Sequence, residues 1–217
     1  HPDVLLAAED CSAWPGVTRA TTGGGLGFDL KWDMGFSHDI RRYLAVHPSK
    51  RAEHHRMLTS RSVYAASESF VLPLSHDEVV HGKGSLINKM PGDHWQQFAN
   101  LRALFGFMWA HPGKKLLFMG GEFGQRREWT HDGELEWWVC DLQGHSGLQQ
   151  LVAQLNRVYR GAPALYQQDF TASGFEWVVA DDAERSVFAF VRKARDGHPP
   201  LLVVSNMTPV PRTNYLL

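Results

Sequence analysis

Two short apolar runs that each end in acidic residues are the strongest constraint on the fold of this chain. The run over residues 4–8 is followed by Glu9, and the run over residues 70–74 is followed by His76 and Asp77. A continuous apolar run of this length is typical of a strand buried on both faces of a parallel sheet. Functional side chains of a β/α barrel lie at the C-terminal ends of its strands, so these acids predict one shared site in such a barrel.

Helical patterns alternate with strands along the first 166 residues. Ser37 is expected to cap one helix, and apolar stripes after Asp93 and after Ser146 each predict another, both with a glutamine at the capping-box position. Residues 26–32 and 115–119 are expected to be further strands. Strands that alternate with helices in this way indicate a parallel α/β domain.

The pattern changes near Gln167, after which no helix is expected. Residues 174–180, 186–192 and 201–205 are β-rich and are joined by short turns, which predicts antiparallel strands. We therefore expect two domains: residues 1–166 would form part of a barrel, and residues 167–217 the start of a small β-sandwich. The first part has too few strands for a complete barrel of eight, so the sequence is expected to be a fragment.

Pro73 conflicts with the strand expected over residues 70–74. Proline has no backbone N–H to donate, so within a sheet it is normally confined to edges, strand starts and bulges. Either the strand is irregular at this residue, or its bounds differ by a few residues from those expected.

Composition excludes several classes of function. The net charge of -1 and the pI near 6.9 provide no electrostatic field that would attract nucleic acid or an anionic membrane. No apolar run approaches the roughly 18 residues that a membrane span requires. Two cysteines in 217 residues do not form a disulfide framework, which favours a reducing, cytoplasmic location.

The carboxyl groups of Glu9 and Asp77 suit the cleavage of a glycosidic bond. One acid can protonate the leaving oxygen while another stabilises or captures the oxocarbenium-like carbon. His76 is adjacent to Asp77, and Trp14 and Trp129 occupy neighbouring loops, where their rings could stack on sugars. Taken singly, a strand-end carboxylate is more often a cap or an ion-pair partner, and a tryptophan more often fills the core.

Other reactive side chains predict no site. His76 and His81 do not have the spacing of a His-Glu-x-x-His motif, so no metal site is expected. Cys11 has no activating base indicated nearby and is expected to be an ordinary loop residue. The His54-His55 pair lies in a charged segment and is expected to face solvent.

The motifs resemble the glycogen (1,4-α-glucan) branching enzymes of the α-amylase superfamily over most of residues 4–180. The runs Ser-His-Asp-Glu-Val-Val-His-Gly-Lys and Phe-Met-Gly-Gly-Glu-Phe are similar to those of branching enzymes rather than of amylases in general. The matching segments are residues 8–12, 24–28, 70–84, 90–93, 95–102, 112–125 and 128–129.

The resemblance implies a fold and a set of roles. The chain would be α/β, forming the C-terminal half of a (β/α)8 TIM barrel (strands five to eight), followed by a truncated antiparallel all-β C-terminal domain. Glu9 would be the catalytic acid/base after the fifth strand, and His76 and Asp77 the pair after the seventh strand that stabilises the transition state. The nucleophilic aspartate would follow the fourth strand, upstream of this sequence. By this resemblance, relatives usually carry Glu-Glu-Ser where this chain has Glu9, Asp10 and Cys11, so the contact beside the acid is expected to differ.

The activity implied by the resemblance is that of a cytoplasmic hexosyltransferase of glycogen biosynthesis. It would cleave an α-1,4-glucan and transfer the segment to a 6-hydroxyl, forming an α-1,6 branch, with no metal and no organic cofactor. Its partners would be donor and acceptor glucan chains, contacted by His76, Trp14 and Trp129. Two alternatives stay open: a debranching or trehalose-releasing hydrolase of the same superfamily, and a non-catalytic glucan-binding protein.

The 217 residues by themselves are expected to be inactive, because the nucleophile implied by the resemblance lies outside them. Iodine staining of amylose after incubation with the chain measures this. Branching activity from residues 1–217 alone would refute the expectation that the sequence is a fragment.

Overall fold

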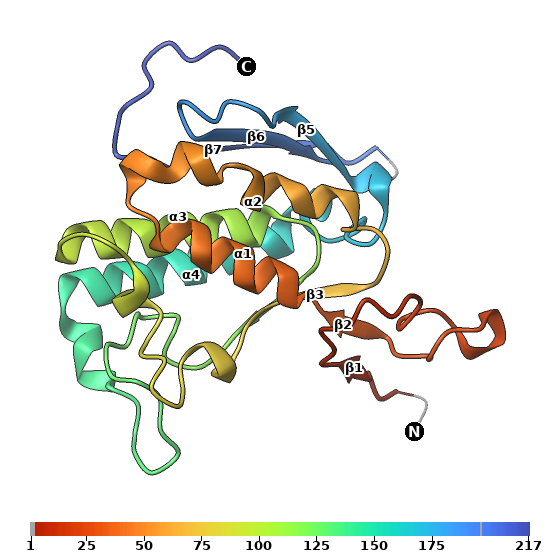
Figure 1. Ribbon diagram of the computed structural model, residues 1–217, viewed down its shortest axis with the longest axis horizontal. Helices are drawn as coiled ribbons and strands as arrows, with labels where there is room; N and C mark the ends of the chain where they lie inside the picture. Colours follow the sequence, from red (N-terminus) through yellow and green to blue (C-terminus); the bar gives the residue numbers. More distant parts are fainter. Residues whose placement is uncertain (1–2, 196) are drawn as a thin grey trace.

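The computed structural model describes residues 3–195 and 197–217 and contains two separate sheets (Figure 1). The first sheet has four parallel strands in the order β1-β2-β3-β4, and the second has three antiparallel strands in the order β5-β6-β7. Their bounds are Ala7–Ala8, Leu30–Trp32, Phe70–Leu74, Lys114–Leu117, Phe175–Val179, Val187–Arg192 and Leu201–Asn206. The predicted change from a parallel α/β part to an antiparallel β part is confirmed.

Helices connect and follow the parallel strands. Helix α1 lies between β2 and β3, α3 lies between β3 and β4, and α4 follows β4. The α-helices are α1 (Met34–Ala45), α2 (Arg56–Thr59), α3 (His94–Ala110) and α4 (Gln143–Gly161). The 3₁₀ turns are η1 (Thr21–Gly23), η2 (Pro48–His54), η3 (Ser60–Val63), η4 (His76–Glu78), η5 (Ile87–Lys89), η6 (Trp137–Asp141), η7 (Pro163–Leu165) and η8 (Ala172–Gly174).

One of the three predicted helix starts is confirmed. Asp93 caps α3 by accepting a hydrogen bond from the Gln96 backbone N–H at 2.9 Å, and the Gln96 side chain accepts one from the Asp93 N–H at 2.8 Å. This reciprocal pair satisfies two backbone donors that a helix start would otherwise leave free.

The caps expected at Ser37 and Ser146 are wrong, because both helices begin earlier. Asp33 caps α1, accepting from the Phe36 N–H at 2.9 Å, and Ser37 lies buried inside the first turns. Helix α4 begins at Gln143, so Ser146 lies within it and its N–H donates to the Leu142 carbonyl.

The first strand is shorter and more exposed than expected. Only two of residues 4–8 pair with β2, and the side chains of Val4, Leu5 and Leu6 are 56%, 73% and 53% exposed. β1 stands at the edge of the sheet, with β2 beside it. A strand at an edge has a neighbouring strand on one side only, so more of it is left exposed. Strand β2 is likewise limited to Leu30–Trp32, shorter than the expected 26–32.

Pro73 lies inside β3, so the strand expected over residues 70–74 is present despite the proline. The reason is local. The carbonyls of Ser69 and Val71 accept from the N–H groups of Lys31 and Asp33. Backbone polar groups of every second residue in a strand face the same neighbouring strand. The nitrogen of Pro73, two residues after Val71, therefore also faces β2. β2 has ended at Trp32 by this level, so no ladder bond is lost there.

Helix α3 forms the centre of the core. Its buried side chains lie on more than one face, and a helix that is apolar nearly all round is one that other elements surround. They are Phe98, Asn100, Leu101, Leu104, Phe105, Phe107, Met108, Trp109 and Ala110. Trp95, which belongs to the predicted stripe, is instead 66% exposed at the start of the helix.

The antiparallel sheet packs on the helices through the aromatic side chains of β6 (Figure 1). Phe188 contacts Tyr43 of α1 and Phe107 of α3 edge-on, with ring centroids 5.9 Å and 6.0 Å apart. His55 stacks flat on Phe188 at 4.2 Å and is only 4% exposed. The expectation that both histidines of the 54–55 pair face solvent is therefore wrong for His55, which the second sheet covers.

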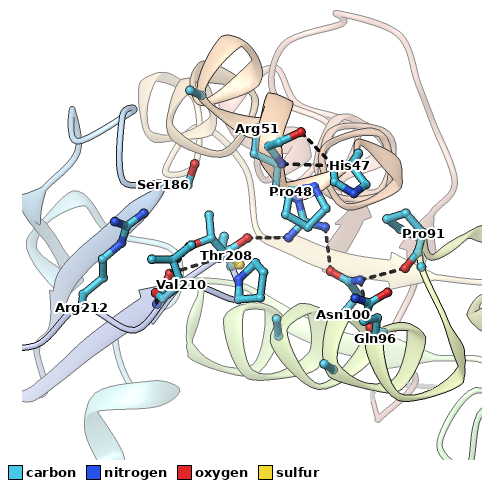
Figure 2. A pocket seen from close by; sticks show the side chains of 18 of the residues that line it. His47, Pro48, Arg51, Pro91, Gln96, Asn100, Ser186, Thr208, Val210 and Arg212 are labelled. Carbon is cyan, nitrogen blue, oxygen red and sulfur yellow. Dashed lines mark hydrogen bonds between the residues drawn. The ribbon is translucent and has the colours of Figure 1, made fainter.

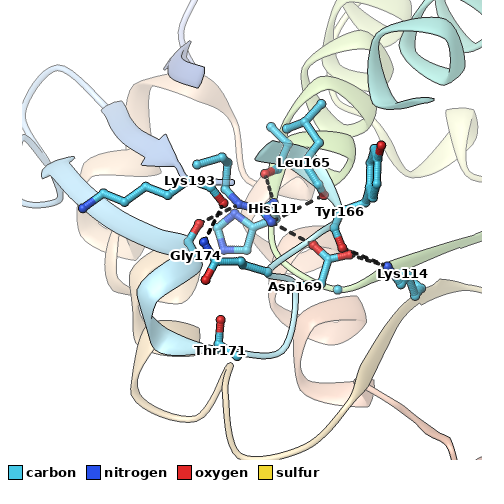
Figure 3. Close-up of polar contacts among 12 residues, drawn as sticks. His111, Lys114, Leu165, Tyr166, Asp169, Thr171, Gly174 and Lys193 are labelled. Atoms are coloured by element: carbon cyan, nitrogen blue, oxygen red, sulfur yellow. Dashed lines mark hydrogen bonds and ion pairs between the residues drawn. The ribbon is translucent and has the colours of Figure 1, made fainter. Parts of the chain in front are cut away.

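A buried ionic network joins the two sheets (Figure 3). The guanidinium of Arg192, at the end of β6, is fully buried and donates to the Asp169 carboxylate at 2.8 Å. It also donates to the Ala110 carbonyl at the end of α3 at 2.7 Å. Lys114 of β4 approaches the other Asp169 oxygen at 2.9 Å. Asp169 thus links the second sheet to the last parallel strand.

The charges of this network determine the ionisation of Asp169. Burial alone would raise its pKa, but the charges of Lys115, Arg192 and Lys114 hold that pKa below its usual value. Burial also lowers the pKa of Lys115 and of His111, well below their ordinary values. His111 is covered by aromatic rings and stacks on Phe107 with centroids 4.6 Å apart.

Replacing Asp169 with Asn should destabilise the chain by about 3–5 kcal/mol, because Arg192 would keep its buried charge and lose its counter-charge. Urea denaturation at neutral pH measures the change. Glu176→Gln is the control: its ion pair with Lys193 is exposed, and such pairs contribute about 0–1 kcal/mol. Because the folded pKa of Asp169 is lowered, its contribution should be complete above about pH 4 and disappear as the pH falls further. Equal losses in both variants would contradict the network's role.

Candidate active site at the strand ends

The C-terminal ends of the parallel strands bring the predicted acids to one edge of the sheet. Glu9 directly follows β1, and His76 and Asp77 form the turn that follows β3. β2 lies between them, in register with both neighbours through Lys31. Glu9 is exposed, and the Asp77 side chain is 40% exposed. Both acids are thus open to a ligand bound across the edge of the sheet.

Two cavities adjoin along this edge. One, of about 800 Å³, is lined by Asp10, Cys11 and Trp14 from the loop after β1. The other, of about 730 Å³, is lined by His76 and by residues that follow β4, including Phe118 and Glu122. Trp32, at the end of β2, lines both. Sequence reasoning missed Trp32 and Glu122, although Trp32 is the last residue of β2 and Glu122 lies in the loop after β4.

The turn after β3 holds His76 beside Asp77. The His76 Nε2 lies 3.4 Å from the Asp77 Oδ1, and the imidazole is 48% exposed. Ser75 caps the turn, and its hydroxyl oxygen accepts a hydrogen bond from the Asp77 N–H at 3.2 Å. The Asp77 carboxylate is therefore located by its backbone and by the neighbouring imidazole.

The segment after Glu9 is fixed by Asp10. The Asp10 carboxylate accepts from the Ser12 N–H and hydroxyl, both at 2.9 Å, and lies 3.0 Å from the Lys31 Nζ. The Ser12 backbone N–H and Lys31 lower the pKa of Asp10 to about 2. The charged Asp10 carboxylate thus holds this loop in place. Cys11, between Asp10 and Ser12, has an exposed free thiol.

The two tryptophans singled out from the sequence have different surroundings. Trp14 is 60% exposed and lines the larger cavity, which leaves its ring free to stack on a ligand. Trp129 is half-buried, with its ring edge-on to that of Phe118 and the centroids 5.2 Å apart. Its backbone N–H donates to the Val79 carbonyl. Much of the Trp129 ring therefore packs against the protein.

Glu128 anchors the glycine-rich loop that follows Asp77. Its carboxylate accepts from the N–H groups of Gly82 at 2.8 Å and Gly84 at 2.6 Å, and these two donors lower its pKa. Lys89 donates to the Gly84 carbonyl from the other side at 3.1 Å. The three residues His81, Gly82 and Gly84 have positive φ angles, so this loop has a defined conformation that the carboxylate holds. Sequence reasoning gave Glu128 no role, since only the fold brings it to this loop.

A further cavity, of about 490 Å³, shares no lining residue with the two at the strand ends (Figure 2). It lies between η2, α3 and the segment after β7. Polar groups around it bind one another: the buried Arg51 donates to the Asn100 Oδ1 at 2.6 Å and to the Met207 carbonyl at 2.5 Å. Its walls thus form a junction between the second sheet and the helices.

In the described part of the chain, no three His, Cys, Asp or Glu side chains are grouped as metal ligands would be.

The whole chain is similar to curated bacterial proteins named 1,4-alpha-glucan branching enzyme GlgB. It is 70% identical over 217 residues to that of Albidiferax ferrireducens, covering 100% of this chain and 35% of the relative. It is 59% identical over 214 residues to that of Aquifex aeolicus, covering 99% of this chain and 34% of the relative. The chain thus spans about a third of the length of these relatives. The resemblance drawn from the motifs is confirmed.

Other comparisons concern the fold. The family described as alpha amylase, C-terminal all-beta domain, matches residues 177–217. The type III pullulan hydrolase from Thermococcus kodakarensis superposes with a TM-score of 0.62 at 18% identity, covering 95% of this chain and 34% of the hydrolase. An alpha-amylase from H. orenii superposes with a TM-score of 0.58 at 16% identity. The match covers 94% of this chain and 43% of the amylase. These matches show the predicted fold class: the later part of an α-amylase barrel followed by its all-β domain.

Replacing Glu128 with Gln should loosen the loop at residues 81–84, because an amide binds backbone N–H groups more weakly than a carboxylate does. Hydrogen exchange at the Gly82 and Gly84 amides should become faster, while exchange in α3 stays unchanged. In the unaltered chain the same protection should be lost as the pH falls through the lowered pKa of Glu128. Unchanged exchange at both glycines would show that the carboxylate does not hold the loop.

Proposed function

We propose that this chain belongs to a 1,4-α-glucan branching enzyme and carries two of its three catalytic acids. The observation that carries the proposal is the placement of Glu9 and Asp77 at the ends of β1 and β3, on one edge of a parallel sheet. Homology to branching enzymes over every residue of the chain supports it. The whole enzyme would cleave an α-1,4-glucan and build α-1,6 branches in glycogen biosynthesis.

Glu9 serves as the acid and then the base of this reaction. In the first half it protonates the oxygen of the α-1,4 bond that breaks, while the glucan segment is transferred to a nucleophilic aspartate. In the second half Glu9 removes the proton from a 6-hydroxyl of the acceptor chain. The oxygen of that hydroxyl attacks the segment's anomeric carbon, and the bond to the aspartate breaks and releases the carboxylate. Glu9 is exposed at the edge of the sheet, so leaving group and acceptor can both reach it.

Asp77 acts on the charged transition state together with His76. A carboxylate beside the sugar ring stabilises the oxocarbenium-like carbon, and the adjacent imidazole can hold sugar hydroxyls. The nucleophile would follow an earlier strand, as the resemblance implies. The 217 residues alone are accordingly proposed to be inactive.

The glucan would lie across the two cavities at the strand ends. Trp14, which lines one cavity, and His76, which lines the other, are proposed substrate contacts. The half-buried Trp129, which lines neither of the two, is the third. Donor and acceptor are both α-1,4-glucan chains. Transfer would exceed hydrolysis when the acceptor chain fills the site and excludes water. The chemistry calls for no cofactor.

The division into domains is part of the proposal. Residues 1–166 would belong to the catalytic barrel and residues 167–217 to the all-β domain. Two contacts would cross this boundary: Arg192 donates to the Ala110 carbonyl, and Asp169 pairs with Lys114. None of the helices in the described residues is long and apolar enough to cross a membrane. The proposed location is the cytoplasm.

In the full-length enzyme, Glu9→Gln should lower turnover by about 10²–10⁴-fold, because the amide can neither donate the catalytic proton nor accept one. Binding of amylose should survive, since the side chain keeps its size. Formation of α-1,6 linkages in amylose measures turnover, and retention on a glucan gel measures binding. Activity within a few-fold of the unaltered enzyme would refute the acid assignment. Release of reducing sugar without new α-1,6 linkages would identify a hydrolase instead.

A further inference from the structure

We propose that Glu78 is the positioning residue for Asp77 and that it holds the catalytic turn against α1. This inference rests on the proposed function, since it assigns how one of the proposed acids is kept in place. Glu78 directly follows Asp77, yet its side chain is only 3% exposed, whereas that of Asp77 is 40% exposed. One acid of the pair is thus open to a ligand, and the other is directed into the protein.

The Glu78 carboxylate accepts four interactions from two elements. One oxygen accepts from the N–H of Ser75 at 2.7 Å and from its hydroxyl at 2.9 Å. The other accepts from the Ser37 hydroxyl at 3.1 Å and lies 3.2 Å from the guanidinium of Arg41. Ser75 belongs to the turn itself, and Ser37 and Arg41 belong to α1. The carboxylate therefore joins the turn to the helix.

The hydroxyl group of Ser75 links the Glu78 carboxylate to the backbone of Asp77. A hydroxyl group has one hydrogen to donate, and that of Ser75 goes to Glu78. With its hydrogen committed, the oxygen presents its lone pairs to the Asp77 N–H, 3.2 Å away. Removing the carboxylate would free the hydroxyl to rotate and would weaken the contact that fixes the Asp77 backbone.

The α1 side of this linkage is rigid. The guanidinium of Arg41 also donates to the Ser37 carbonyl at 3.0 Å, which fixes both donors on one turn of the helix. Phe36, Ile40 and Tyr43 of the same helix pack into the core. A carboxylate at this depth that kept its charge without such partners would be strongly unfavourable. The linkage is therefore held from the helix side as well as from the turn.

Asp77 depends on this linkage because its own side chain has little support. Among the described residues its only ion-pair partner is His76, at 3.4 Å, and both side chains are about half exposed. The position of its carboxylate is therefore set by the backbone of the turn. A shift of 1 Å in such a group can lower the rate by about 100-fold.

Kinetics of the full-length enzyme test the inference with Glu78→Gln, Ser75→Ala and the double variant. Each single change should lower kcat for branching of amylose by about 10- to 100-fold, with little change in KM. The double variant should be no slower than the slower single variant, because both changes break the same linkage. Arg41→Lys keeps a cation beside Glu78 and should stay close to the unaltered kcat, whereas Arg41→Met should not.

Asp182→Asn is the matched control. Asp182 also accepts from a backbone N–H, a hydroxyl and a guanidinium, namely those of Arg185 and Tyr215, but in the turn between β5 and β6. This variant should lower the melting temperature and leave kcat unchanged. A purely structural role for Glu78 would make the two variants behave alike.

The outcomes separate the inference from the proposed function. An unaltered full-length enzyme that makes no α-1,6 linkage refutes the proposed function. An active enzyme whose Glu78→Gln variant keeps its kcat overturns the inference, as does a loss of kcat matched by Asp182→Asn. If Glu78→Gln does not fold, Ser75→Ala decides alone: it retains the contacts of Glu78 with α1 and removes only the hydroxyl, so an unchanged kcat overturns the inference.

Discussion

The arrangement of the two sheets depends on the interactions of the fully buried Arg192 guanidinium. It binds the end of α3 through the Ala110 carbonyl and binds the Asp169 carboxylate, which also takes Lys114 of β4. Because an unpaired charge at this depth would cost several kcal/mol, few arrangements of these elements are tolerated. Helix α3 is thereby fixed between the parallel sheet and the antiparallel sheet, and the loop that leads from β3 into α3 has a defined end point.

The candidate site follows from that framework. Parallel strands end on the same edge, so Glu9 and Asp77 share it without any contact between them being needed. The loops around them are then fixed by carboxylates that face inward: Asp10 holds the loop after β1, Glu78 the turn after β3, and Glu128 the loop beyond it. Acids that hold the backbone are buried or engaged, and acids proposed for chemistry are open.

Sequence patterns predicted the order and type of the elements well. The cap at Asp93, the strands β3 to β7 and the change to an antiparallel sheet all follow from local signals such as apolar runs, capping pairs and turn residues. The same signals failed at Ser37 and Ser146, where a stronger cap or an earlier turn existed, and at His55, which the second sheet buries. Arg192 and Asp169 carried no local sign of burial, because their partners are distant in sequence.

Local sequence patterns alone were enough to predict the parallel and antiparallel parts, the strand-end positions of Glu9, His76 and Asp77, and the resemblance to branching enzymes. These features depend on short-range periodicity and on contiguous motifs. Which of the acids are exposed to solvent and which are turned into the protein depends on the tertiary structure. Asp77 and Glu78 are adjacent and chemically alike, yet one is open and the other is held by Ser37 and Arg41 of α1. That difference comes from the packing of α1 against the turn, which no local pattern encodes.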